Sequence, residues 1–350
     1  MVVQKSELAQ KISKLKNVVP KTPTISALQG ILVQDGYLIA NNMEMAVKAK
    51  LEGMEGEAFI IPMKAFDLIS NLPEGEVEIT AADGAITIKA EKIKNTYRTL
   101  DPDTFPMNEI GGGDETEVSI KSEVFLEAVK HVSYAISPFP GKSTMAALCL
   151  QAGGGMLNFV GLDGRVLAWD KVEYDGKFEL LIPKNTVDRL LGIGLTGEVS
   201  IRHNKLRAVF ATEDYEISTR LVDGQYYKYQ SMFKEMPLHT SAVRFELLNA
   251  MVRAKMCTEE KKAVRFEFTN DVLNISLNDN TTEYDETVNL REPMADDLVI
   301  GFDARLILDT LKAFNCEAVR LHLAGPKMPM IVEAEGRSMF RAVVLPVMIG

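Results

Sequence analysis

The sequence predicts an α+β fold in which one arrangement of two helices and antiparallel strands occurs three times. Stretches 60–108 and 181–229 each read as strand, helix, hairpin, strand and aromatic turn, and the same number of residues separates Pro62 from Leu100 as Pro183 from Leu221. A more diverged third copy covers 299–347. The copies recur at about 120 residues, far longer than a solenoid repeat, so each unit is expected to be a domain. The expected domains are 1–113, 114–236 and 237–350.

Each unit is expected to begin with an amphipathic helix. Leu8, Ile12, Leu15 and Val19 recur at helical spacing, and Ser6 or a neighbour is expected to cap the helix. The second unit repeats this spacing, and in the third Leu248, Met251 and Val252 mark the expected buried side. The lysines at 11, 14 and 16 fall off the apolar stripe of the first helix, so we expect them to face water or a ligand. Shorter second helices are expected at 63–72, 184–191 and 302–314.

Period-two patterns between the helices indicate strands. Asp35-Gly36 and Asp83-Gly84 are strong hairpin signals, and turns are also expected at the glycine run 153–155 and at Asn270-Asp271. These hairpins favour mostly antiparallel sheets. Linkers are expected near 110–115 and 234–240.

Composition describes an ordinary soluble protein. The chain has 350 residues, of which 46% are hydrophobic and 25% charged. The N-terminal stretch lacks the apolar core of a signal peptide, and no apolar run is long enough to span a bilayer. Three distant cysteines favour a reduced, cytoplasmic setting. The net charge of −10 weighs against a nucleic-acid partner unless basic residues gather on one surface.

No catalytic constellation is found in the sequence. Pro140–Thr144 ends like a phosphate-binding loop, but Ile136 stands where the first glycine is required. The four histidines lack metal-binding spacing, and the carboxylate pairs lie in expected loops. We therefore expect no catalytic residue, metal or cofactor. The apolar C-terminal residues 347–350 either line a groove for a partner or pack on their own domain.

Several segments, taken in order and spacing, resemble a known family over essentially the whole chain. They are Pro23-Thr24, Asn42–Met45, Leu162–Ala168, Arg220–Gly224, Ile300–Asp303 with Leu308-Asp309, and Val343–Met348. In these segments the chain resembles the bacterial DNA polymerase III β subunit, the sliding clamp. The resemblance implies three clamp-fold domains per chain and a head-to-tail homodimer that forms a six-domain ring.

The resemblance also implies a ring that encloses double-stranded DNA without sequence preference, with helices lining the hole. Topological linkage needs only a mild positive field inside an acidic exterior, which reconciles the net charge with a DNA partner. The candidate DNA-facing residues are Lys11, Lys14, Lys21, Lys64, Lys142 and Lys184. Lys255 and Met256 are candidates for the dimer interface.

In the family, the replicative polymerase, the clamp loader and repair polymerases insert a short peptide into a cleft between the second and third domains. The positions that match its walls are Met145, Leu162, Gly164, Arg165, Val166, Leu167, Leu306, Val343, Val344, Leu345, Pro346, Val347, Met348 and Ile349. The chain departs from the family's Thr-Asp-Gly-His-Arg-Leu at 162–167, and Met348 stands where the family usually has Arg.

The function expected from these observations is a non-enzymatic processivity factor without a membrane partner. One alternative is a divergent clamp-like adaptor that binds partners but loads poorly on DNA, a hypothesis motivated by the altered cleft. A second is a hydrolase or transferase on a repeated α/β scaffold, which would require a convergent polar site that the sequence does not display.

Overall fold

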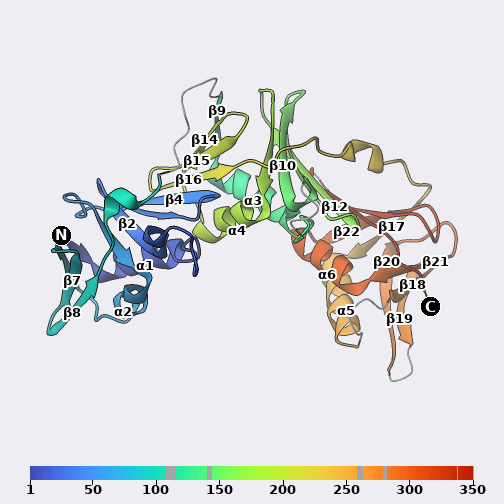
Figure 1. The fold of residues 1–350 in the computed structure, drawn as a ribbon. Helices are drawn as coiled ribbons and strands as arrows, with labels where there is room; N and C mark the ends of the chain where they lie inside the picture. Colours follow the sequence, from blue (N-terminus) through green and yellow to red (C-terminus); the bar gives the residue numbers. More distant parts are fainter. Residues whose placement is uncertain (108–115, 140–143, 258–262, 279–281, 337, 350) are drawn as a thin grey trace. The chain divides into compact units, whose positions relative to one another are not determined.

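A computed structural model describes residues 1–107, 116–139, 144–257, 263–278, 282–336 and 338–349. Along the chain, the order strand, helix, four strands, helix, three strands occurs three times (Figure 1). All strand pairs in the described ranges are antiparallel. The predicted α+β class and the repeated arrangement of its elements are confirmed.

The elements of the three repeats have the following bounds. The first repeat contains β1 (Val2–Gln4), α1 (Lys5–Leu15), β2 (Gly30–Gln34), β3 (Tyr37–Asn41), β4 (Met45–Lys50), β5 (Phe59–Pro62), α2 (Phe66–Ser70), β6 (Glu76–Ala82), β7 (Ala85–Ala90) and β8 (Ile93–Arg98). The second contains β9 (Thr116–Lys121), α3 (Ser122–Ser133), β10 (Ala147–Gly153), β11 (Met156–Leu162), β12 (Val166–Glu173), β13 (Phe178–Pro183), α4 (Lys184–Ile193), β14 (Glu198–His203), β15 (Arg207–Ala211) and β16 (Tyr215–Arg220). The third contains β17 (Leu238–Val243), α5 (Arg244–Met256), β18 (Ala263–Thr269), β19 (Val272–Asn278), β20 (Glu283–Glu292), β21 (Leu298–Asp303), α6 (Ala304–Ala313), β22 (Ala318–Leu323), β23 (Met330–Ala334) and β24 (Arg341–Val344).

The chain divides into two compact units. Unit 1 comprises Met1–Leu126 and Asp188–Leu221, and unit 2 comprises Glu127–Val187 and Val222–Gly350. Both cuts in the middle repeat pass through a helix, α3 in one case and α4 in the other. The three-domain division with boundaries after residues 113 and 236 remains a prediction.

Each unit is built on extended antiparallel sheets. Unit 1 has a four-stranded sheet in the order β1-β6-β7-β8 and an eight-stranded sheet in the order β5-β2-β3-β4-β16-β15-β14-β9. Unit 2 has a twelve-stranded sheet in the order β13-β10-β11-β12-β24-β23-β22-β17-β20-β19-β18-β21. Strands of successive repeats therefore join directly, β4 with β16 in unit 1 and β12 with β24 in unit 2.

The predicted hairpin turns are confirmed by their backbone angles. Asp35 and Gly36 have φ values of 52° and 78°, and Asp83 and Gly84 have 51° and 68°. Two successive positive φ values define the type I′ turn, whose twist matches that of the strands it joins. Asn270 also has a positive φ, of 47°.

α1 and α5 begin without a side-chain cap, so the expectation that Ser6 or a neighbour caps α1 is wrong. β1 runs directly into α1, and the Lys5 N–H donates to the Gly75 carbonyl at 2.8 Å. Ser122 and Arg244 make the same backbone bond, to Gly197 and Glu317, at 2.9 Å each. A neighbouring loop thus satisfies a donor that a cap would otherwise serve.

α5 buries only part of the face expected, because Met251 is buried but Leu248 and Val252 are not fully covered. Leu247, Ala250, Met251 and Ala254 are buried, whereas Leu248 and Val252 are only half-buried. Phe245 and Met256, at the two ends of the helix, are 63% and 79% exposed. Two apolar stripes run side by side on this helix, and helical spacing alone does not decide which one packs inward. The outer stripe, which carries Phe245, Leu248, Val252 and Met256, is left partly open to solvent.

Candidate functional site

A cavity of about 280 Å³ opens in unit 2 beside the junction of β12 and β24. It contains eight of the fourteen predicted cleft positions. Its lining consists of Met145, Leu162, Gly164, Arg165, Val166, Leu167, Tyr227, Lys228, Ser231, Met232, Val343 and Leu345. Most of these side chains are apolar, and the basic groups are contributed by Arg165 and Lys228. The predicted cleft residues therefore converge from the turn before β12 and from β24.

The turn between β11 and β12 shapes one wall. The Asp163 carboxylate accepts the backbone N–H groups of Arg165 at 2.8 Å and Val166 at 2.9 Å. Gly164, the residue after Asp163, has a φ of 91°, a backbone conformation that residues other than glycine rarely adopt. The carboxylate and the glycine together fix the turn and hold its backbone close to the cavity.

β24 forms the adjoining wall. Leu167 of β12 lies opposite Val343 of β24, and the Leu345 N–H donates to the Arg165 carbonyl at 2.9 Å. The sheet pairing therefore continues past the end of β24 into the tail. Val343 and Leu345, two positions apart in extended chain, both line the cavity.

The segment after β16 supplies the wall that sequence reasoning missed. Tyr227, Lys228, Ser231 and Met232 lie in it, partly within the 3₁₀ turn Tyr229–Met232. It is anchored by Tyr229, which is buried, packs edge-on against Trp169 at 5.2 Å and donates to Gln151 Oε1 at 2.9 Å. The density of tyrosines at 226–229 in an expected loop was the available signal, because loops rarely bury aromatic rings without a reason.

The rim of the cavity is basic. Arg165 Nη1 lies 3.2 Å from Asp303 Oδ2, and its Nη2 lies 3.7 Å from Asp163 Oδ2. These carboxylates hold the guanidinium at the mouth while leaving the Arg165 side chain 46% exposed. An apolar pocket with a polar, oriented rim can take an apolar side chain of an extended peptide.

Six predicted cleft residues lie outside this lining. Leu306 and Val344 are buried in the structure. The tail instead packs on its own sheet edge: the Val347 N–H donates to the Gly301 carbonyl at 2.9 Å, and Ile349 lies against the Cα of Gly301. Met348 projects outward and is 86% exposed. Pro346, like Val347, is half-buried.

The candidate DNA-facing lysines occupy unlike environments. Lys11 is 7% exposed, with its Nζ 3.6 Å from Asp214 Oδ1 and 4.6 Å from the Tyr215 ring centre. The expectation that Lys11 faces water is therefore wrong. Its charge is compensated inside unit 1, because the turn before β16 folds over α1.

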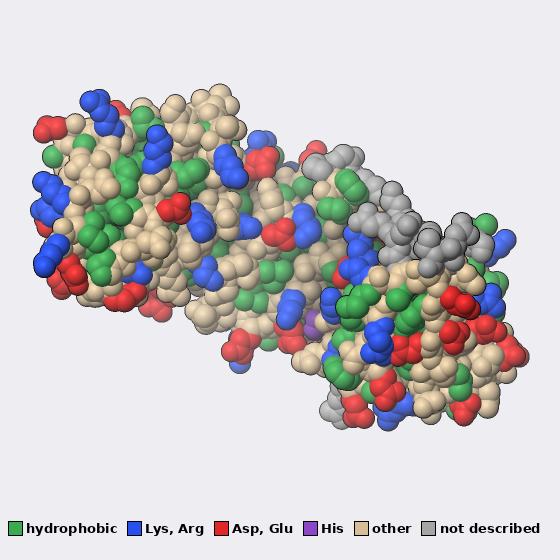
Figure 2. Space-filling model, turned by 90° about the horizontal axis from the view of Figure 1, so that it is seen from below, with side chains coloured by type: hydrophobic (Ala, Val, Ile, Leu, Met, Phe, Trp, Pro, Cys, Tyr) green, Lys and Arg blue, Asp and Glu red, His purple; other side chains and the backbone are tan. Residues whose placement is uncertain are grey.

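The other lysines are more accessible. Lys14 is half-buried and donates to the Gly192 carbonyl at 2.9 Å, near the end of α4, where helix carbonyls lack partners. Lys21 and Lys64 are exposed, and Lys184 is half-buried at the start of α4. Lys142 lies outside the described residues. In Figure 2, Lys and Arg side chains of unit 1 stand singly among other side chains on the face drawn.

The two candidate interface residues, Lys255 and Met256, form the end of α5, and both are exposed. Their position continues the outer apolar stripe of that helix. Their role in an interface remains a prediction.

The described side chains show no group of three or more His, Cys, Asp or Glu residues that could hold a metal. Burial raises the pKa of the Cys149 thiol far above its ordinary value, so this thiol stays protonated. Cys149 therefore acts as a packing group. In the described ranges, each helix is too short or too polar to cross a bilayer.

Comparison with known proteins identifies relatives over the full chain. Residues 236–348 match the family model of the DNA polymerase III beta subunit, C-terminal domain. The beta sliding clamp of Salmonella typhimurium is 24% identical over 362 residues, covering 98% of each chain. That of Pseudomonas aeruginosa is 23% identical, with the same coverage.

Solved structures share the fold. The DNA polymerase sliding clamp from Bacillus subtilis superposes with a TM-score of 0.92 at 18% identity, covering 100% of this chain and 99% of the other. The Pseudomonas aeruginosa sliding clamp bound to griselimycin gives a TM-score of 0.92 at 23% identity, with equal coverage. The family model therefore assigns residues 236–348 to the C-terminal domain of the DNA polymerase III beta subunit, and the whole chain is similar in sequence and in fold to bacterial sliding clamps.

Proposed function

We propose that this protein is a DNA sliding clamp: two copies close a ring around duplex DNA and tether a replicative polymerase through the cavity between β12 and β24. The protein acts without catalysis, in the cytoplasm, and its mechanism is topological. The observation that carries the proposal is a strand-pairing rule that two junctions of the chain obey and that a second copy would complete.

The two junctions share one register. Ala46 of β4 lies opposite Ser218 of β16, and Leu167 of β12 lies opposite Val343 of β24. Ala46 and Leu167 hold the same place in their hairpins, because each follows a two-residue turn and one closing residue. The fourth strand of one repeat thus pairs with the last strand of the next.

Ser218 and Val343 also hold the same place in their sheets. Arg202, Val209 and Ser218 are aligned across three strands, as are His322, Ile331 and Val343. Arg202 follows Gly197 by the same number of residues as His322 follows Glu317. The carbonyls of Gly197 and Glu317 accept the first N–H of α3 and of α5, respectively. The register is therefore the same in both junctions.

Two strands of the same kinds take no part in these junctions. They are β20, the fourth strand of the third repeat, and β8, the last strand of the first repeat. By the same counting, Glu283 corresponds to Leu167 and Thr96 to Val343. Within one chain β8 ends its four-stranded sheet, and β20 has no second neighbour along 283–289 among the described strands. We expect β20 to pair with β8 of a second copy, head to tail, and a twofold repetition of this contact closes a ring.

Side-chain chemistry supports this register. In the first junction Lys48 lies opposite Glu216, with Nζ 3.2 Å from Oε1. At the equivalent place of the third junction, Asp285 would lie opposite Lys94 of the partner subunit, an opposite-charge pair with the signs exchanged. Such directly opposed pairs favour one register over its neighbours.

The outer stripe of α5 would be covered by the same contact. Counted from the helix starts Ser122 and Arg244, Met256 corresponds to Tyr134, whose hydroxyl is buried within unit 2. We therefore expect Met256, and with it Lys255, to meet the partner subunit. This explains why large apolar side chains remain open on the isolated chain.

The DNA contact would be a diffuse one. Exposed lysines such as Lys21 and Lys64 can meet phosphates, which gives binding without sequence preference. A closed ring needs no tight site, so a net charge of −10 is compatible with an enclosed duplex. Lys11 is left out of this set because its charge is already paired.

Charge exchange across the proposed junction tests the ring. Lys94→Glu and Asp285→Lys should each lower the solution mass from twice 38.8 kDa toward the single chain, and the double variant should restore it. Lys92→Glu, in the turn before β8, is the matched control and should stay dimeric. With a clamp loader and ATP, the dimeric forms should be retained on circular DNA and lost when it is cut. A wild-type chain that stays monomeric at micromolar concentration would instead favour the adaptor hypothesis.

A further inference from the structure

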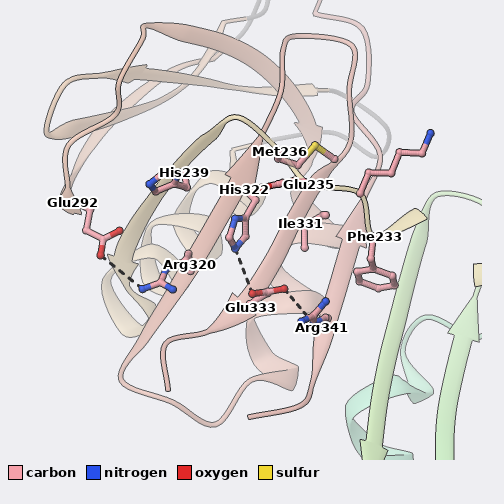
Figure 3. A pocket seen from close by; sticks show the side chains of 11 residues that line it. Phe233, Glu235, Met236, His239, Glu292, Arg320, His322, Ile331, Glu333 and Arg341 are labelled. Atoms are coloured by element: carbon pink, nitrogen blue, oxygen red, sulfur yellow. Dashed lines mark ion pairs between the residues drawn. The ribbon is translucent and has the colours of Figure 1, made fainter. Parts of the chain in front are cut away.

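A second and larger cavity of about 580 Å³ lies in unit 2, on the face of the sheet formed by β17, β22, β23 and β24 (Figure 3). Residues Phe233–Met236 form its rim opposite the strands. The cavity that binds partner peptides in the proposed function is lined by other residues, so the two sites can be tested separately.

Basic side chains from neighbouring strands converge on this cavity. Arg341 Nε lies 3.2 Å from Glu333 Oε1, and His322 Nε2 lies 3.4 Å from Glu333 Oε2. One carboxylate therefore serves two partners, as Figure 3 shows. The contact with His322, and then the charge of Arg341, hold the pKa of Glu333 below its ordinary value. Glu333 is therefore ionised at neutral pH.

Arg320 is held more loosely. Its Nη2 lies 3.7 Å from Glu292 Oε1 and 4.0 Å from Glu335 Oε1, beyond hydrogen-bond length in both cases. Its Nε is buried without a hydrogen-bond partner among the described residues. The Arg320 side chain as a whole is 41% exposed, so its terminal N–H groups can donate to an incoming acceptor.

The same cavity has an apolar part. Phe233, Met236 and Ile331 line it, the first two from the rim and the third from β23 between the charged strands. Phe233 also packs against Trp169, with ring centres 5.1 Å apart, so the rim is anchored to the second repeat's sheet. Cations beside a fixed apolar surface are the arrangement that binds amphipathic anions.

We propose that this cavity binds a small organic anion, whose carboxylate or phosphate lies between Arg320 and Arg341 and whose apolar part packs on Phe233. The planar fork of a guanidinium matches either oxyanion in two-point contact. Glu333 keeps the Arg341 guanidinium oriented before the ligand arrives, and Glu292 lies near the guanidinium of Arg320. Since those carboxylates also balance the local charge, the ligand needs its apolar part as well as its anionic group.

Direct binding to the full-length protein tests the site. Isothermal titration calorimetry at low salt would use N-acetylphenylalanine as the carboxylate probe and adenosine monophosphate as the phosphate probe. Acetate and inorganic phosphate, which carry the same anionic groups without the aromatic part, are their counterparts. We expect one aromatic probe to bind at least about tenfold more tightly than its counterpart. Which of the two binds identifies the oxyanion.

Variants separate this site from general charge effects. Arg320→Gln and Arg341→Gln should each weaken the bound probe about tenfold, and Phe233→Ala should abolish the preference for the aromatic probe. Arg265→Gln is the matched control, since Arg265 is similarly exposed and paired with Glu267 in the same unit. Equal weakening in the control, or no heat from any probe at about 5 mM, would overturn the proposal. The solution mass of each variant shows independently whether the proposed dimer is intact.

Discussion

Arg165 and Asp303 join two distant segments of the chain at the mouth of the 280 Å³ cavity, with Nη1 and Oδ2 3.2 Å apart. The same Asp303 carboxylate accepts the Arg305 N–H at 2.9 Å and so caps α6. One side chain therefore begins a helix and orients the cation that marks the cavity's rim. Its two roles can be separated by mutation.

Asp303→Ala should lower the free energy of unfolding by about 1–2 kcal/mol, because it removes a helix cap together with a partly exposed ion pair. Arg165→Ala should cost less than about 1 kcal/mol, since it removes only the ion pair. Urea denaturation of both variants checks this order. Equal losses would show that the cap contributes little.

Met232→Ala should weaken peptide binding without changing the fold. Met232 is partly buried on the wall of the 280 Å³ cavity, so its removal takes away apolar surface that a bound side chain would contact. We expect about a tenfold loss of affinity for a fluorescent peptide with adjacent large apolar residues, measured by anisotropy. Met328→Ala, at an exposed position elsewhere in unit 2, is the control. A loss of similar size in the control would point to an indirect effect.

Lys11 should act through packing rather than through its charge. Lys11→Met keeps an unbranched chain against Tyr215 and should change stability by less than about 1 kcal/mol. Lys11→Ala empties that space and should cost about 1–3 kcal/mol. Chemical denaturation gives both values, with exposed Lys16→Ala near zero as the reference. A Met variant as unstable as the Ala variant would show that the ion pair to Asp214 matters most.

Glu333 should make stability depend on pH. Its pKa is lowered in the folded protein from an ordinary value of 4.5, so the unfolded chain binds the proton more readily. The stabilisation is present above pH 4.5 and is lost as the pH falls through the folded value. Glu333→Gln should therefore be less stable than wild type at pH 7, with the difference shrinking below pH 4.5. Exposed Glu52→Gln should show a smaller dependence in the same series.

Local chemistry explains what the sequence could predict. Asp-Gly turns fix the hairpins at residues 35 and 83 because few other pairs adopt two successive positive φ values. The apolar spacing of Leu8, Ile12 and Leu15 marks a stripe that is indeed buried. The resemblance to a known family pointed to Leu162, Leu167, Val343 and Leu345, and these side chains do line one cavity.

Contacts between distant segments explain what it could not. Lys11 is buried by a turn that follows some two hundred residues later, and nothing in its own helix reveals this. α5 has two apolar stripes, and the choice between them depends on the strands it meets. Tyr227 and Met232 reach the cavity only because Tyr229 and Trp169 hold their segment down.

Among the described strands, β8 has one edge without a neighbouring strand, and so does β20 along residues 283–289, so we expect protomers to associate more readily as their concentration rises. A strand with unpaired N–H and C=O groups can template pairing with any other chain, and β20 is long. If the proposed junction covers both edges, the ring is also the state in which the protein is protected from aggregation. Dilution or a broken junction would then release an aggregation-prone protomer. We therefore expect cells to keep the subunit assembled even when it is not bound to DNA.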